Sequence, residues 1–111
     1  VGLGVGLTPS GDDFLVGMLL AFWICRGYRG CFDQLASGIK EKVGDTNQIS
    51  GQYLLCACQG EYGSLFHELI GQLHTGSDIR ESLKRIGRMG HSSGIDTLNG
   101  ILTGLWLCRE E

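Results

Sequence analysis

The sequence predicts an all-α protein that folds as a compact bundle of about six helices. Apolar residues recur at helical spacing in one segment after another, and β-branched residues never alternate for more than a few positions, as strands would require. Turns of one to six residues separate these segments, a length that antiparallel helical neighbours prefer. Two of the predicted helices are nearly all apolar, so we expect them at the centre of the bundle.

The first of these central helices is predicted over residues 12–26. Asp12 and Asp13 lie in its first turn, where carboxylates favour the positive end of the helix dipole, and Gly27 follows as a stop. The apolar run FLVGMLLAFWIC has 12 residues, whereas a membrane span needs about 20. We therefore expect a buried helix and no membrane partner.

Four further helices are predicted over residues 32–43, 45–60, 63–74 and 78–89. The candidate caps of the second are Asp45, Thr46 and Asn47, and that of the fourth is Ser77.

The last helix is predicted over residues 94–108 and is the second central one. Trp23 and Trp106 belong to the two central helices, so we expect both indoles in the core. Gly17, Gly100 and Gly104 suit a close crossing of the two helices.

Composition limits the class of protein. The net charge is −3 and the basic residues are scattered, apart from RESLKRIGR over residues 80–88, which argues against a nucleic-acid partner. The five cysteines show no C-x-x-C spacing and four lie in apolar runs, so we expect a reduced, cytoplasmic protein without structural zinc. The chain opens in mid-motif at Val1, so we expect residues 1–111 to be a single helical domain from the C-terminal part of a longer protein.

A ten-residue phrase occurs twice, 83 residues apart. From Ser10 and again from Ser93 the sequence reads S-G-x-D-x-L-x-G-(M/I)-L. Each copy straddles the start of one central helix, where backbone N–H groups without helical partners can bind an anion. If the two helices pack as pseudo-symmetric partners, these starts converge on one pocket that holds a small anionic substrate.

The polar residues around the two helix starts exceed what capping requires, so they are the candidate site. The candidate catalytic residues are Asp12, Asp13, His91 and Asp96, and the candidate ligand-binding residues are Gly6, Thr8, Ser10, Gly11, Ser92, Ser93 and Gly94. His91 suits a proton donor or an anion contact near neutral pH. The aspartates would repel a bare phosphate, so they either hold a divalent metal such as Mg²⁺, cap backbone amides or orient a substrate amide N–H. The sequence leaves these possibilities open.

Three segments together resemble the AllH-like family: GLTPSGDDFLVGML (residues 6–19), QISGQYLLCACQGEY (48–62) and GHSSGIDTLNGIL (90–102). The resemblance covers essentially the whole chain, as that family's C-terminal domain. Named members are subunits of oxamate carbamoyltransferase in allantoin breakdown. Membership implies phosphorolysis of oxalurate to oxamate and carbamoyl phosphate, performed together with other subunits. The matching motif positions are Gly6, Thr8, Ser10, Gly11, Asp12, Asp13, His91, Ser93, Gly94 and Asp96.

Two other functions fit the same residues. One is an Mg²⁺-dependent phosphate- or nucleotide-binding enzyme domain in which Asp12, Asp13 and Asp96 hold the metal. The other is a non-catalytic helical subunit that builds an interface within an assembly.

Overall fold

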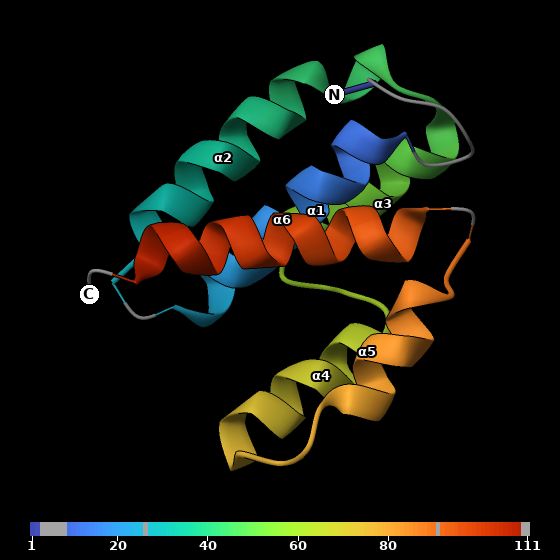
Figure 1. Cartoon of the computed structure of the whole chain (residues 1–111). Helices are drawn as coiled ribbons and strands as arrows, with labels where there is room; N and C mark the ends of the chain where they lie inside the picture. The colour runs from blue at the N-terminus through green and yellow to red at the C-terminus, as the bar shows by residue number, and fades with distance from the viewer. Residues whose placement is uncertain (3–8, 26, 91, 110–111) are drawn as a thin grey trace.

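The helical prediction is confirmed by a computed structural model that describes residues 1–2, 9–25, 27–90 and 92–109 (Figure 1). Within these ranges the chain forms no strand, and its elements are α1 (Ser10–Ile24), α2 (Arg29–Lys42), the 3-10 turn η1 (Val43–Asp45), α3 (Gln48–Cys58), α4 (Ser64–Thr75), α5 (Arg80–Gly87) and α6 (Ser93–Cys108). None of the helices described is long and apolar enough to cross a membrane.

The two repeated segments form α1 and α6, which cross in close contact and run in the same direction. A Cβ atom on Gly17 would clash with the carbonyl oxygen of Thr97 and would lie 2.9 Å from the Cα of Gly100. One turn further along, a Cβ atom on Gly104 would clash with the Cβ of Ala21. The packing role predicted for the three glycines is confirmed, because side chains at these positions would force the backbones apart.

The register of this crossing matches the register of the repeat. Gly17 meets Gly100 and Ala21 meets Gly104, and in both pairs the two residues are 83 positions apart. The repeated phrase therefore specifies two parallel helices that pack with equivalent residues facing each other. This arrangement places the N-termini of α1 and α6 at the same end of the pair.

Helical pairs cover the α1–α6 unit on two sides. Val16 and Leu19 of α1 pack into a core cluster with residues of α2 and α3 such as Phe32 and Leu54. A second cluster joins Leu20 of α1 and Ile101 of α6 to α4 and α5. In Figure 1 the α4–α5 pair lies below α6 and the α2–α3 pair lies on the far side of α1.

Two cap predictions have different outcomes. Asn47 is the N-cap of α3, because its side-chain oxygen accepts the N–H of Ser50 at 2.8 Å. The prediction for Ser77 is wrong, since α5 begins only at Arg80 and the Asp78 carboxylate accepts the N–H of Arg80 at 3.0 Å. An aspartate close to the helix start satisfies that donor, and the serine is left in the preceding turn.

The prediction that both tryptophans lie in the core is wrong. Trp23 is 36% exposed and Trp106 is 62% exposed. The guanidinium of Arg29 lies 4.0 Å from the ring centroid of Trp23, and that of Arg109 lies 3.7 Å from the ring centroid of Trp106. Each indole therefore sits at the surface with a cation over its face, an arrangement that does not require burial.

Candidate functional site

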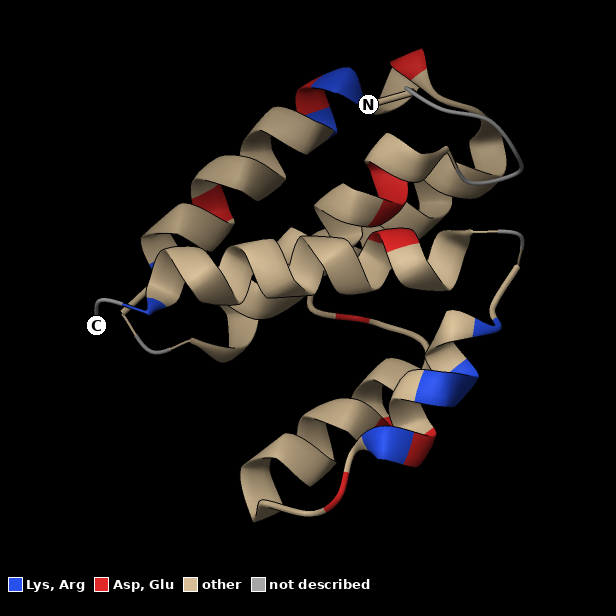
Figure 2. Cartoon of the chain, viewed as in Figure 1, with Lys and Arg blue, Asp and Glu red and all other residues tan. Residues whose placement is uncertain are grey.

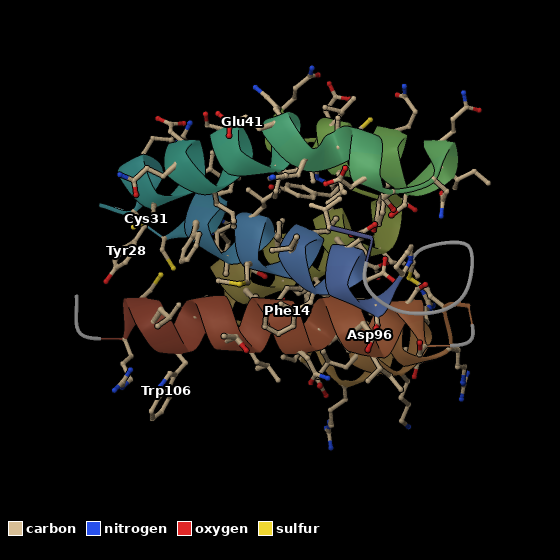
Figure 3. All side chains as sticks on the ribbon, turned by 90° about the horizontal axis from the view of Figure 1, so that it is seen from above. Phe14, Tyr28, Cys31, Glu41, Asp96 and Trp106 are labelled. Carbon is tan, nitrogen blue, oxygen red and sulfur yellow. The ribbon has the colours of Figure 1, made fainter. Side chains whose placement is uncertain are left out.

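The candidate site lies where α1 and α6 begin. The two helices cross where Gly17 meets Gly100. Asp13 lies four residues before Gly17, and Asp96 lies four residues before Gly100. Because residues four apart share one side of a helix, each aspartate lies on the side of its helix that faces the other helix. Figure 2 shows the acidic starts of α1 and α6 next to each other, and Figure 3 shows Asp96 near the start of α1 from a second direction.

Asp13 is fully buried, with none of its surface exposed to solvent. Its negative charge acts on Tyr53 of α3. Burial, and after it the charge of Asp13, raises the pKa of Tyr53 to about 12. Tyr53 therefore keeps its phenolic proton at neutral pH and lies within electrostatic reach of the buried carboxylate.

Asp12 is also buried, but it lies on the other side of α1. Its Oδ2 accepts the hydroxyls of Thr46 at 2.6 Å and Ser50 at 2.7 Å, and its Oδ1 accepts the N–H of Gly2 at 2.7 Å. Burial by itself would raise the pKa of Asp12, but these three hydrogen bonds outweigh it and lower the pKa below its usual value. The carboxylate thus joins the start of α1 to the start of α3 and to the N-terminal segment.

The start of α6 combines polar groups with close packing. Ser92 donates its hydroxyl to Oδ2 of Asp96 at 2.9 Å, and the hydroxyl of Thr97 donates to the carbonyl of Ser93 at 2.9 Å. A Cβ atom on Gly94 would clash with the carbonyl oxygen of Ile86, so this glycine lets α6 begin against the end of α5. Ser92, Ser93 and Asp96 are half-buried, which leaves part of each side chain in contact with solvent.

At the start of α1, Pro9 occupies the N-cap position, and the proline side chain has no atom that can accept an N–H. Ser10 and Gly11 follow as the first two helical residues and are half-buried. The N-cap of α6 is Ser92, whose side chain likewise makes no cap hydrogen bond. Neither helix start is therefore closed by the side chain of its N-cap residue.

The predicted site residues differ in where they lie. Asp13, Asp96, Ser10, Gly11, Ser92, Ser93 and Gly94 lie around the starts of the parallel pair, whereas Asp12 faces α3. Gly6, Thr8 and His91 lie outside the described residues. Among the residues that are described, no three or more His, Cys, Asp or Glu side chains are grouped so that they could hold a metal ion. The oxygens of Asp12 are already engaged by three protein donors, so it is poorly suited to Mg²⁺.

The contribution of α3 was missed by the sequence-based reasoning. Ser50 is buried against Asp12, and the half-buried Tyr53 lies near Asp13. Their spacing of three residues on a largely apolar helix is a signal that could have identified α3 as the polar neighbour of α1.

Comparison with known proteins adds a family to this geometry. No solved structure matches the chain. A family model described as "Oxamate carbamoyltransferase subunit AllH" matches residues 1–105. This match spans both helix starts and the helices between them, and the chain therefore belongs to the AllH family of oxamate carbamoyltransferase subunits.

Proposed function

We propose that the chain forms part of a carbamoyltransferase-type enzyme and binds a small anionic ligand between the starts of α1 and α6. The observation that carries this proposal is the parallel, in-register pairing of the two repeated segments. Because of that pairing, two helix N-termini with the same Ser-Gly-x-Asp sequence open at one end of the fold. Ligands of this class are carbamoyl phosphate and oxamate.

The chemistry of these ligands matches the mixture of groups at the two helix starts. Both molecules carry anionic oxygens next to an amide-type NH2 group. The N–H groups of the first helical turns favour the anionic oxygens and the negative charge that develops on a carbonyl oxygen during carbamoyl transfer. The carboxylates of Asp13 and Asp96 would accept the N–H groups of the same ligand. A bare inorganic anion offers no such donor and would be repelled by both aspartates.

The word "subunit" in the family description implies further subunits, and these have a role in this proposal. Enzymes that recognise carboxylates or phosphates commonly use arginine, and arginine is missing from the polar residues of the two repeats. We propose that a partner subunit supplies the missing cation at this site.

Asp13→Asn is expected to abolish stabilisation of the chain by carbamoyl phosphate or oxamate. At about 100 times its Kd, a ligand stabilises the folded protein by about 2.7 kcal/mol, and the amide of Asn removes the negative charge and replaces one acceptor oxygen with an NH2 donor. Because Asn has the shape of Asp, the melting temperature without ligand should fall by about 4–8 °C or less, equivalent to about 1 kcal/mol. Thermal unfolding with and without each ligand measures both effects.

Asp33→Asn on the exposed side of α2 is the matched control and should keep the full ligand shift. If Asp13→Asn unfolds the apo protein, the residue is structural and the proposed ligand contact is wrong. Stabilisation by a nucleotide only in the presence of Mg²⁺ would instead identify a metal-dependent phosphate site. The absence of any ligand response, alone and together with partner subunits, would contradict the binding function and favour a non-catalytic subunit.

A further inference from the structure

The outer face of α6 exposes three large apolar side chains, with the polar Asn99 among them. Ile95, Leu102 and Trp106 are 51%, 64% and 62% exposed, and their spacing of seven and four residues places them on one side of the helix. In Figure 3 the side chain of Trp106 points away from α1 and α2. Large apolar side chains that gather on one face in this way mark an interaction surface more often than isolated exposed residues do.

Comparison with the equivalent face of α1 shows how this surface of α6 differs from a buried one. The positions 83 residues earlier on α1 are Asp12, Leu19 and Trp23. On α1 this face is covered in large part by α2 and α3: Leu19 is fully buried in the core cluster, and the ring of Trp23, which remains 36% exposed, lies 5.0 Å from that of Phe32. The same face of α6 has no such cover among the described residues. In the part of the chain that the structure describes, one of two equivalent faces is therefore uncovered.

We propose that a second copy of this chain covers this face, with the two α6 helices packed antiparallel about a two-fold axis near Leu102. The exposed residues on this side of α6 are Ile95, Asn99, Leu102 and Trp106, and none of them is charged. The face can therefore meet its own copy without repulsion between like charges, even though the chain has a net charge of −3. Two-fold homodimers are also the commonest soluble assemblies, and their interfaces bring the same patch of both copies together.

The charges at the ends of α6 favour the antiparallel orientation. Asp96 lies in its first turn and Arg109 directly follows its last residue. A parallel pair would place the two Arg109 side chains at one end and the two Asp96 side chains at the other. The antiparallel pair separates the two Arg109 side chains from each other and the two Asp96 side chains from each other, and the helix dipoles also oppose each other.

The expected dimer is reversible, because the interface is small. α6 has 16 residues, so the contact along it is about 24 Å long. That length places the interface near the lower end of the range for specific complexes, for which a Kd of about 1–100 µM is a reasonable expectation. Packing of Leu102 against its copy at the centre makes this residue the most sensitive to substitution.

Sedimentation equilibrium of the chain over a concentration series tests the proposal. The wild type should pass from monomer to dimer, and Leu102→Glu should weaken the association by about 100-fold or more, because it buries two carboxylates against each other at the axis. Ile49→Glu is the matched control, since Ile49 on α3 is 58% exposed and should leave the dimer unchanged. Both positions are exposed, so both variants should keep the helical circular dichroism of the wild type.

Cross-linking tests the two-fold axis directly. Helices packed at about 8–10 Å bring facing Cα atoms within the range of about 4.4–6.8 Å that a disulfide spans. In a background in which the exposed Cys31 is replaced by serine, Leu102→Cys should therefore oxidise to a covalent dimer, whereas Ile49→Cys should not. A chain that stays monomeric, a dimer that tolerates Leu102→Glu, or equal cross-linking at both positions would overturn the proposal and leave the face to a different protein.

Discussion

Replacing Gly17 with alanine is expected to lower the free energy of unfolding by about 3 kcal/mol or more. The added methyl group would clash with the carbonyl oxygen of Thr97 and would lie 2.7 Å from the amide nitrogen of Ile101. Both atoms belong to the backbone of α6, so no side chain can rotate to make room. The two central helices would have to separate, and contacts along the length of their interface would weaken.

Thermal and urea unfolding of Gly17→Ala measures this effect. The melting temperature should fall by about 10 °C or more. The matched control is Gly38→Ala on α2, where an added Cβ atom meets nothing within 4 Å. Since alanine favours a helix over glycine, this control should raise stability by about 0.5–1 kcal/mol. If Gly17→Ala melts like Gly38→Ala, the close crossing of α1 and α6 is wrong, and with it the argument that both helix starts share one end.

Because the sequence contains a repeat, it predicted more of the site than the local pattern of either segment could have predicted by itself. Matching phrases at Ser10 and Ser93 indicated two equivalent helix starts, and the glycines at 17, 100 and 104 indicated a close crossing. Together these features implied a pair in which the starts converge. The parallel register that the structure shows depends on those same glycines, because only their positions allow the two backbones to touch.

The different surroundings of Asp12 and Asp13 were not predictable from the sequence. The two residues are adjacent and chemically identical, yet neighbouring side chains on a helix point about 100° apart. Asp13 lies on the side toward α6, whereas Asp12 meets Thr46 and Ser50. Those partners belong to a different part of the chain, so the distinction depends on how α3 packs against α1, which no local pattern specifies.

The exposure of Trp106 has a similar cause. Many residues of its helix are apolar, a composition typical of burial. Whether an apolar face becomes buried depends on what packs against it. The helices α2 and α3 lie against α1, and none of the described helices lies against the outer face of α6. A helix that forms part of an interface has the same sequence pattern as a helix in a core.

The carboxylate of Asp12 is expected to contribute about 2–4 kcal/mol to the stability of the fold, measured as the loss on Asp12→Ala. Alanine would leave the hydroxyls of Thr46 and Ser50 and the N–H of Gly2 without their acceptor, and a buried donor left in this way costs about 1–3 kcal/mol. Ser50 is fully buried, so water cannot replace the lost acceptor there. Asp33→Ala on the exposed side of α2 should change stability by no more than about 0.5 kcal/mol.

Asp12→Asn keeps the shape of the side chain, removes its ionisation and replaces one of the two acceptor oxygens with an NH2 donor. The three hydrogen bonds outweigh burial and lower the pKa of Asp12 in the folded state, so the unfolded chain binds the proton more readily than the folded protein does. The stabilisation is therefore fully present above the unfolded pKa of about 3.9 and is lost as the pH falls through the folded pKa. Urea unfolding from neutral pH into this acidic range should show wild type and Asp12→Asn converging in stability. A gap between them that stays constant at every pH would mean that Asp12 has the same pKa in the folded and unfolded states, and the lowering of its pKa by the three hydrogen bonds would then be wrong.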